Sequence, residues 1–258
     1  MLLTIDIGNT NITLGVFDNT TLVNSWNLST DKNKTDDEYG ILLRSLINMK
    51  LEAAVISSVV LSLTDKIKSA IEKYLNVPVL VISSKTQTGI ILDVENPKEV
   101  GCDRIANACA AYSMYKGPTV VVDFGTATNF DVMTEDGRFI GGIIAPGLKM
   151  SAESFSSNTN LLPKLNIEGI ESVIGRNTVT NMLSGVVVGH AAMIDGLLER
   201  IEGELQTPVT VIATGGFSPI ITKHMKKQFH HLNKHLTLEG LRIIYELNKS
   251  VCHCEEQA

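Results

Sequence analysis

The sequence has little of several features that mark other classes of protein. Only four cysteines occur in 258 residues, too few for a disulfide framework, so a cytoplasmic location is expected. The net charge is −6 and no basic stripe is interleaved with aromatic residues, so we expect no nucleic-acid partner. No apolar run reaches bilayer length, and the N-terminus lacks the basic region of a signal peptide, so no membrane partner is expected either.

What is present indicates a folded chain with well-buried sheets. Hydrophobic residues make up 44% and charged residues 19% of the chain, which is typical of a globular protein. A length of 258 residues lies near the size at which one core divides into two. Two small domains, or one duplicated domain, are therefore expected.

A repeated pattern supports the duplication. Residues 4–11 read TIDIGNTN and residues 121–129 read VVDFGTATN. Each is an apolar run followed by Asp, a hydrophobe, Gly and small hydroxyl or amide side chains. The alternation of apolar runs and helical stripes after each copy predicts the order β-β-β-α-β-α-β twice. The expected domains are residues 1–117 and 118–258, each with a mixed sheet.

Local signals place several elements within these halves. Thr35 and Glu38 have the spacing of a capping box and predict the start of a helix. An apolar stripe with helical spacing predicts a second amphipathic helix, and its residues are Ile67, Ala70, Ile71, Tyr74 and Leu75. Residues 180–202 are predicted to be helical, and residues 208–216 to form a strand that ends in two glycines.

The two Asp-Gly segments have two interpretations. Either one alone could be an ordinary β-turn, because Asp and Gly favour turns. Two of them, each at the head of a similar half, favour two hairpins that bind the phosphates of a nucleotide, since glycine lets the backbone approach and hydroxyl and amide groups donate hydrogen bonds. The candidate ligands are Asp6, Ile7, Gly8, Asn9, Thr10, Asn11, Gly125, Thr126 and Thr128.

Two further features fit a nucleotide. Asp6 and Asp123 would repel phosphate unless a cation lies between, which suggests Mg²⁺ at one of them. Gly215 and Gly216 follow a predicted strand, where a flat adenine could lie against backbone without a Cβ in the way. A pair of glycines after a strand is more often only a turn. The pair indicates a nucleotide only because it follows the two Asp-Gly segments along the chain.

These segments resemble the phosphate and adenosine motifs of the actin, sugar-kinase and Hsp70 superfamily. Within it, NPKEVGCDR at residues 96–104 is similar to the NPxxVGxDR signature of type III pantothenate kinases, and residues 141–147 and 174–185 resemble two further motifs of that family. The resemblance implies two ribonuclease-H-like halves with an ATP cleft between them. It also implies phosphorylation of the primary hydroxyl of pantothenate by ATP, the first step of coenzyme A biosynthesis.

The resemblance also implies roles for individual residues. Asp103 would be the general base, and Arg104 would bind pantothenate beside Gly101. Thr178 would reach the substrate across a homodimer interface. Asp123 would hold a monovalent cation, K⁺ or NH₄⁺, and Asp6 would hold Mg²⁺. Without the flanking motifs, Asp103 and Arg104 would read as a surface ion pair at a helix start.

The sequence departs from the family pattern at two positions. Val94 stands where the family usually has a Tyr that walls the pantothenate pocket, which leaves open a sugar or small carboxylate as acceptor. Cys102 stands where Ala is common, and its position beside a helix start raises the alternative of a reactive thiol, which burial would oppose. A nucleotide-sensing regulator on the same fold is a further alternative, against which the intact Asp103 and Arg104 argue.

Two remaining segments give weaker signals. The run SGVVVGHAAMIDGLL at residues 184–198 is more apolar than one helix buries alone, and is a candidate subunit interface with His190 as a packed side chain. The sequence CHC at residues 252–254 could bind a metal ion, although three ligands near a chain end are a weak indication.

Overall fold

A computed structural model of the chain describes residues 1–252 apart from residue 84 and residues 159–161. The chain divides into two compact units: unit 1 is Met1–Met114 with the chain from Leu236 onward, and unit 2 is Tyr115–His235. Each unit contains a mixed β-sheet with helices packed on it. The predicted α/β class with two sheet-based halves is confirmed.

The sheet of unit 1 has the first hairpin at its centre. Its strands are β1 (Leu2–Ile7), β2 (Asn11–Asp18), β3 (Thr21–Ser29), β4 (Ala53–Ser58) and β5 (Val79–Val81). They lie in the order β3-β2-β1-β4-β5. β1 is antiparallel to β2 and parallel to β4. The carboxyl ends of β1 and β4 therefore meet at one edge of the sheet.

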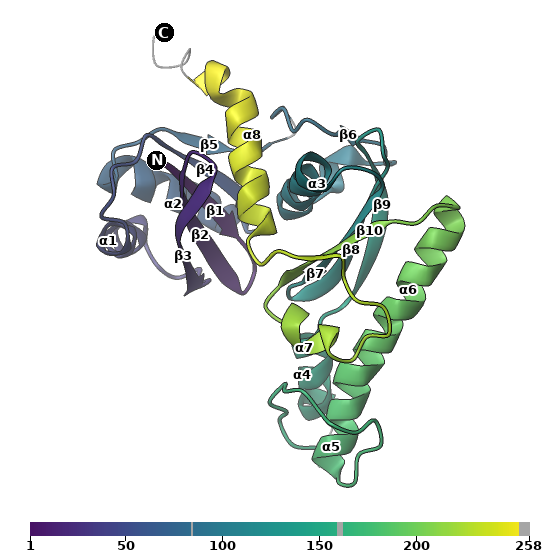
Figure 1. Cartoon of the computed structure of the whole chain (residues 1–258). Helices are drawn as coiled ribbons and strands as arrows, with labels where there is room; N and C mark the ends of the chain where they lie inside the picture. The colour runs from purple at the N-terminus through teal and green to yellow at the C-terminus, as the bar shows by residue number, and fades with distance from the viewer. Residues whose placement is uncertain (84, 159–161, 253–258) are drawn as a thin grey trace. The chain divides into compact units, whose positions relative to one another are not determined.

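Helices cover both faces of this sheet (Figure 1). The remaining elements of unit 1 are α1 (Asp36–Leu46), α2 (Leu61–Tyr74), a short β6 (Ile91–Leu92), a 3-10 turn η1 (Pro97–Glu99), α3 (Cys102–Tyr115) and α8 (Leu236–Cys252). One core cluster joins α1 and α2 to one face, through residues such as Tyr39, Leu43 and Ile67. Another joins α3 and α8 to the opposite face.

The predicted local signals in unit 1 are confirmed. The Thr35 hydroxyl accepts from the Glu38 N–H at 3.2 Å, and the Glu38 carboxylate accepts from the Thr35 N–H at 2.8 Å, which together form the capping box of α1. α2 buries Ile67, Ala70 and Ile71, three members of the apolar stripe. The order of elements from β1 to β5 is the predicted β-β-β-α-β-α-β.

The C-terminal helix differs from the predicted division at residue 118. α8 was expected in the second half, but Leu238, Leu241 and Ile244 lie in the core cluster that covers the sheet of unit 1. A repeat in the order of elements predicts that a helix exists, whereas the sheet it covers depends on tertiary packing. The apolar face of α8 could cover either sheet, so the sequence alone does not show on which sheet the helix packs.

Unit 2 repeats the arrangement. Its strands are β7 (Thr119–Phe124), β8 (Ala127–Met133), β9 (Arg138–Pro146), β10 (Thr210–Gly215) and β11 (His231–Leu232). Within the unit they lie in the order β11-β10-β7-β8-β9. β7 is antiparallel to β8 and parallel to β10. Its helical elements are α4 (Leu148–Asn158), α5 (Thr178–Leu183), the π-helical turn η2 (Ser184–Val188), α6 (Gly189–Leu205) and α7 (Ser218–Thr222).

One helical stretch of unit 2 is unusually apolar. Residues Thr178–Leu205 are long and apolar enough, by length and composition alone, to cross a membrane, and half of the most apolar window is buried inside the protein. The stretch is not an uninterrupted apolar run, because polar residues such as Asn181, His190 and Asp195 lie within it. The buried side of α6 includes Ala191, Ile194 and Leu198, which pack in the core of unit 2, as expected of a core helix.

A close helix contact in unit 1 gives a stability prediction. A Cβ on Gly240 of α8 would lie 1.9 Å from the backbone oxygen of Ala106 in α3, so Gly240→Ala forces the two helices apart. We expect a loss of about 2–4 kcal/mol of unfolding free energy, measured by urea denaturation. The matched control is Gly203→Ala in α6, where a Cβ meets nothing within 4 Å and helix propensity predicts a gain of up to about 1 kcal/mol. Equal stability of the two variants would contradict the tight α3–α8 contact.

Candidate active site

The polar residues of unit 1 gather where β1 and β4 end. Asp6 of β1 lies beside Ser57 of β4 in the parallel register. The Ser57 hydroxyl donates a hydrogen bond to Asp6 Oδ1, and Ser57 is fully buried while Asp6 is half-buried. Sequence reasoning missed Ser57, because a serine inside an apolar strand carries no signal of its partner. This hydrogen bond orients the Asp6 carboxylate at the edge of the sheet.

The turn between β1 and β2 is tight and carries exposed polar residues. Gly8 N–H donates to Asn11 O at 2.9 Å, and Asn9, Thr10 and Asn11 are exposed. A Cβ on Gly8 would already lie 3.0 Å from Asn11 O, so the tight turn favours glycine. Backbone N–H groups and polar side chains in a short turn of this kind are the groups that bind anions.

Ile7 differs from the expectation that it contacts the nucleotide. Its side chain is 0% exposed and lies in a core cluster of unit 1, and its carbonyl accepts from the Val59 N–H at 3.1 Å. The alternation of side chains along a strand puts Ile7 on the opposite side from Asp6. Its contribution is to packing beneath the turn.

The GCDR segment begins α3. A Cβ on Gly101 would lie 2.4 Å from Asp103 Oδ1 and 3.7 Å from the Val59 side chain just beyond β4. Glycine is therefore needed for Asp103 to hold its carboxylate in this position. Asp103 Oδ1 accepts from the Arg104 N–H at 2.9 Å, which orients the carboxylate at the helix start.

Cys102 links this segment to Asp6. Burial raises the pKa of its thiol, and the negative charges of Asp103 and Asp6 raise it further. A Cβ on Gly101 would lie 3.7 Å from the Val59 side chain, and the Val59 N–H donates to Ile7 O at 3.1 Å, so the GCDR segment begins near the end of the strand that carries Asp6. The raised pKa argues against the alternative of a reactive Cys102, since the thiolate is the nucleophile.

Val94 and Arg104 complete the set predicted in unit 1. Val94 lies half-buried between β6 and η1, and Arg104 is half-buried in the first turn of α3. The structure thus places Gly101 and Asp103 near the end of β1 that carries Asp6, and the β1–β2 turn follows Ile7, the last residue of β1.

Unit 2 has a corresponding edge where β7 and β10 end. Asp123 of β7 lies beside Thr214 of β10 and opposite Asn129 of β8 in the strand registers. Gly125 and Thr126 form the exposed turn between β7 and β8. The second Asp-Gly segment therefore occupies in unit 2 the place that the first occupies in unit 1.

Gly215 and Gly216 lie at the same edge as Asp123. Gly215 has φ +88°, and a Cβ there would lie 2.5 Å from Phe124 O in the adjacent strand, so both the conformation and the space require glycine. Gly216 is exposed and has nothing within 4 Å of a Cβ. The predicted position of an adenine ring is against the exposed backbone at Gly216.

Thr128 differs from its predicted role as a phosphate ligand. It is 0% exposed, and its hydroxyl lies 2.9 Å from His190 Nε2 of α6. Thr126 and Thr128 are two residues apart, yet the hairpin turn separates them, so that one is exposed and the other faces the core. The prediction of His190 as a packed side chain is confirmed, because it is 7% exposed and its ring lies 6.3 Å from that of Phe124.

Thr178 is exposed as the first residue of α5. The Asn177 side chain accepts from the Thr180 N–H at 2.9 Å and caps this helix, which fixes the backbone at Thr178. Thr178 of α5 and Asp123 of β7 thus lie on separate elements of unit 2.

The site offers single carboxylates to a metal ion. Among the residues that the structure describes, no group of three or more His, Cys, Asp and Glu side chains could hold a metal. A divalent ion that also takes phosphate oxygens and water as ligands needs only one or two carboxylates, which Asp6 can supply. Of the CHC segment, residues 253 and 254 lie outside the described residues.

Comparison with known proteins decides the family. A family model described as type III pantothenate kinase matches residues 2–200. The chain belongs to the type III pantothenate kinase family. Type III pantothenate kinases from Finegoldia magna and Myxococcus xanthus are 45% and 43% identical to it, over 97% and 96% of this chain and 98% and 99% of theirs.

Solved structures agree with the fold of this family. A Baf family transcriptional activator from Campylobacter jejuni has a TM-score of 0.59 at 19% identity, covering 96% of this chain and 99% of that one. A ROK hexokinase from Thermus thermophilus has a TM-score of 0.52 at 12% identity, covering 94% and 97%. At these identities the likeness concerns the fold alone, which is that of sugar kinases and related ATPases.

His190 gives a pH-dependent stability prediction. Burial lowers its pKa from 6.5 to about 4. As the pH falls from 6.5 toward 4, the unfolded chain therefore takes up a proton at this histidine before the folded chain does. The contribution of neutral His190 to stability is present above pH 6.5 and is lost toward pH 4. Between pH 6.5 and pH 4, the unfolding free energy of the wild type should fall by about 1 kcal/mol per pH unit relative to that of His190→Gln. Urea denaturation at several pH values measures both unfolding free energies. A difference between the two proteins that does not change with pH would contradict a buried, neutral imidazole.

Proposed function

We propose that this kinase transfers the γ-phosphoryl group of ATP to the primary hydroxyl of pantothenate, forming 4′-phosphopantothenate, with Asp103 as general base. The family match over residues 2–200 carries the reaction. The placement of the Asp103 carboxylate over a glycine at the start of α3, near the end of the strand that carries Asp6, supports its role. This reaction is the first step of coenzyme A biosynthesis.

The proposed chemistry needs positioning more than covalent catalysis. The hydroxyl oxygen of pantothenate attacks the γ-phosphorus as the bond to the β-phosphate oxygen breaks, and ADP leaves. Asp103 accepts the hydroxyl proton, a late event in phosphoryl transfer. The hydrogen bond from the Arg104 N–H to Asp103 Oδ1 keeps the carboxylate oriented for this transfer.

The turns of both units are proposed to bind ATP. Gly8, Asn9, Thr10 and Asn11 in unit 1 and Gly125 and Thr126 in unit 2 form exposed or half-exposed turns rich in donors. Mg²⁺, when bound, would neutralise charge on the β- and γ-phosphates, and Asp6 would hold it. Asp123 would hold K⁺ or NH₄⁺, and Gly215 and Gly216 would lie against the adenine.

The acceptor side is proposed from the residues around α3. Arg104 would bind the pantothenate carboxylate or amide, for which a guanidinium is well shaped. Val94, smaller than a tyrosine, would leave a wider pocket and weaker binding. A sugar or small carboxylate as acceptor is the alternative, and the identity of 45% to a type III pantothenate kinase favours pantothenate.

A homodimer in the cytoplasm is proposed as the working form. Three apolar side chains near Thr178 are exposed: Val173 by 67%, Ile174 by 80% and Val179 by 43%. A second subunit covering this surface would shield them from water, and it would bring Thr178 to the partner's substrate. Nucleic acid and membranes are not expected as partners.

Asp103→Asn tests the catalytic assignment. Loss of the general base should lower kcat by at least about 100-fold, whereas the affinity for ATP should change little because the substitution keeps the side-chain shape. The measurement is ADP release with ATP, Mg²⁺ and pantothenate, combined with calorimetric titration of a non-hydrolysable ATP analogue. A variant that no longer binds the analogue would contradict the role of Asp103, and wild-type protein without pantothenate-dependent ADP release would contradict the acceptor.

Replacement of K⁺ by Na⁺ tests the assignment of Asp123. The same assay should lose activity by about tenfold in Na⁺, equivalent to about 1.4 kcal/mol in the barrier, since the smaller ion fits a K⁺ site poorly. Asp123→Asn should be slow in both salts and should no longer distinguish them. A wild type that is equally active in both salts would remove the reason to place a monovalent cation at Asp123.

A further inference from the structure

Thr30, the residue directly after β3, holds the β1–β2 turn from one side. Its hydroxyl donates to Gly8 O at 2.7 Å, and its backbone N–H donates to Thr10 O at 3.0 Å. Nothing in the sequence marks Thr30, which is 22 residues from Gly8. Two of the carbonyl groups in the turn are therefore bonded to one residue of a neighbouring strand end.

These two bonds decide which groups of the turn face a ligand. The described part of the chain has no cis peptide bonds, and in a trans peptide the C=O and N–H of one unit point in opposite directions. With the carbonyls of Gly8 and Thr10 held against Thr30, the N–H groups of Asn9 and Asn11 are turned away from it. A phosphate is attracted by N–H groups and repelled by carbonyl oxygens, so this orientation favours an anion.

Thr30 is itself held by the segment that follows. The Asp31 N–H donates to the Tyr39 hydroxyl at 3.1 Å, and that hydroxyl donates to Asp31 O at 2.8 Å. Tyr39 is 1% exposed and belongs to the core beneath α1. The backbone next to Thr30 is thus fixed to the rigid part of unit 1.

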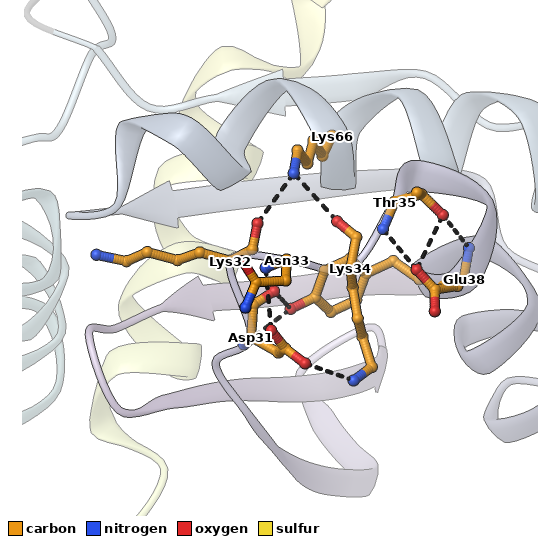
Figure 2. A network of polar contacts seen from close by, with 8 residues as sticks. Asp31, Lys32, Asn33, Lys34, Thr35, Glu38 and Lys66 are labelled. Atoms are coloured by element: carbon orange, nitrogen blue, oxygen red, sulfur yellow. Dashed lines mark hydrogen bonds and ion pairs between the residues drawn. The ribbon is translucent and has the colours of Figure 1, made fainter.

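The rest of the segment is fixed by a second helix (Figure 2). Lys66 Nζ of α2 donates to Lys32 O at 3.0 Å and to Lys34 O at 3.1 Å. The Asp31 carboxylate accepts from the Asn33 N–H and from Lys34 Nζ, both at 3.0 Å. Two helices and an ion pair therefore hold residues 31–34, which continue directly from Thr30.

We propose that Thr30 is a positioning residue for ATP, whose hydroxyl holds the β1–β2 turn in the conformation that binds phosphate. The inference rests on the proposed nucleotide site in that turn and adds a residue outside it. Lys66 supports the same conformation from a greater distance, through the backbone of residues 31–34. Neither side chain needs to touch the nucleotide.

The test compares Thr30→Val, which keeps the shape and removes the hydroxyl, with Thr30→Ser, which keeps the hydroxyl. Thr30→Val should weaken binding of a non-hydrolysable ATP analogue with Mg²⁺ by about fivefold to tenfold, as expected for one lost hydrogen bond. It should raise KM for ATP by a similar factor while KM for pantothenate stays within about twofold. Thr30→Ser should restore both values.

A second pair of variants on α2 provides a matched control. Lys66→Met removes the two bonds to residues 32 and 34 and should weaken analogue binding by about twofold to threefold. Lys68→Met on the same helix removes only an exposed contact to Glu72 of 3.8 Å and should bind like the wild type.

Three outcomes would overturn the positioning role. They are equal analogue affinity of Thr30→Val and wild type, equal loss in Thr30→Val and Thr30→Ser, and a rise in both KM values by the same factor. Analogue binding does not depend on the acceptor. A wild type that binds the analogue but does not phosphorylate pantothenate would overturn the proposed reaction, and the comparison of the Thr30 variants would still decide this inference.

Discussion

Parallel pairing of two strands in each unit is the constraint on which the placement of the polar residues depends. β1 pairs with β4 and β7 pairs with β10, so the carboxyl ends of each pair meet at one edge, where ligands of open α/β sheets bind. Asp6 and Asp123 occupy those ends. An antiparallel neighbour in place of β4 would have put a strand start beside Asp6 and removed Ser57 from it.

The turns at these edges depend on glycines for separate reasons. Gly101 leaves room for the carboxylate of Asp103, and Gly215 allows both a positive φ and close approach to Phe124. Gly8 permits the tight turn after Asp6. These positions share the absence of a Cβ, but a methyl group would disturb a side chain in the first case, a neighbouring strand in the second and the turn itself in the third.

Much of the fold could be predicted from the sequence because its signals are local. The capping box of Thr35 and Glu38 and the apolar stripe of α2 each depend on residues within a few positions of one another. Both hairpins also followed from short patterns. The contacts of Ser57 with Asp6, Thr30 with Gly8 and His190 with Thr128 join residues 51, 22 and 62 positions apart. Such contacts are set by sheet register and helix packing, which composition and spacing do not encode. For the same reason the sequence did not reveal that the side chains of Ile7 and Thr128 face inward.

The attachment of α8 to the first sheet has a consequence for the order of folding. Unit 2 is continuous in sequence, whereas unit 1 needs both the N-terminal segment and the chain from Leu236. During synthesis, the sheet of unit 1 leaves the ribosome first but lacks the apolar cover of Leu238, Leu241 and Ile244 until the last residues appear. Unit 2 can complete its core earlier, although its strands are made later. A chain interrupted near residue 235 would therefore present an exposed apolar sheet face to chaperones and proteases, with its second unit already folded.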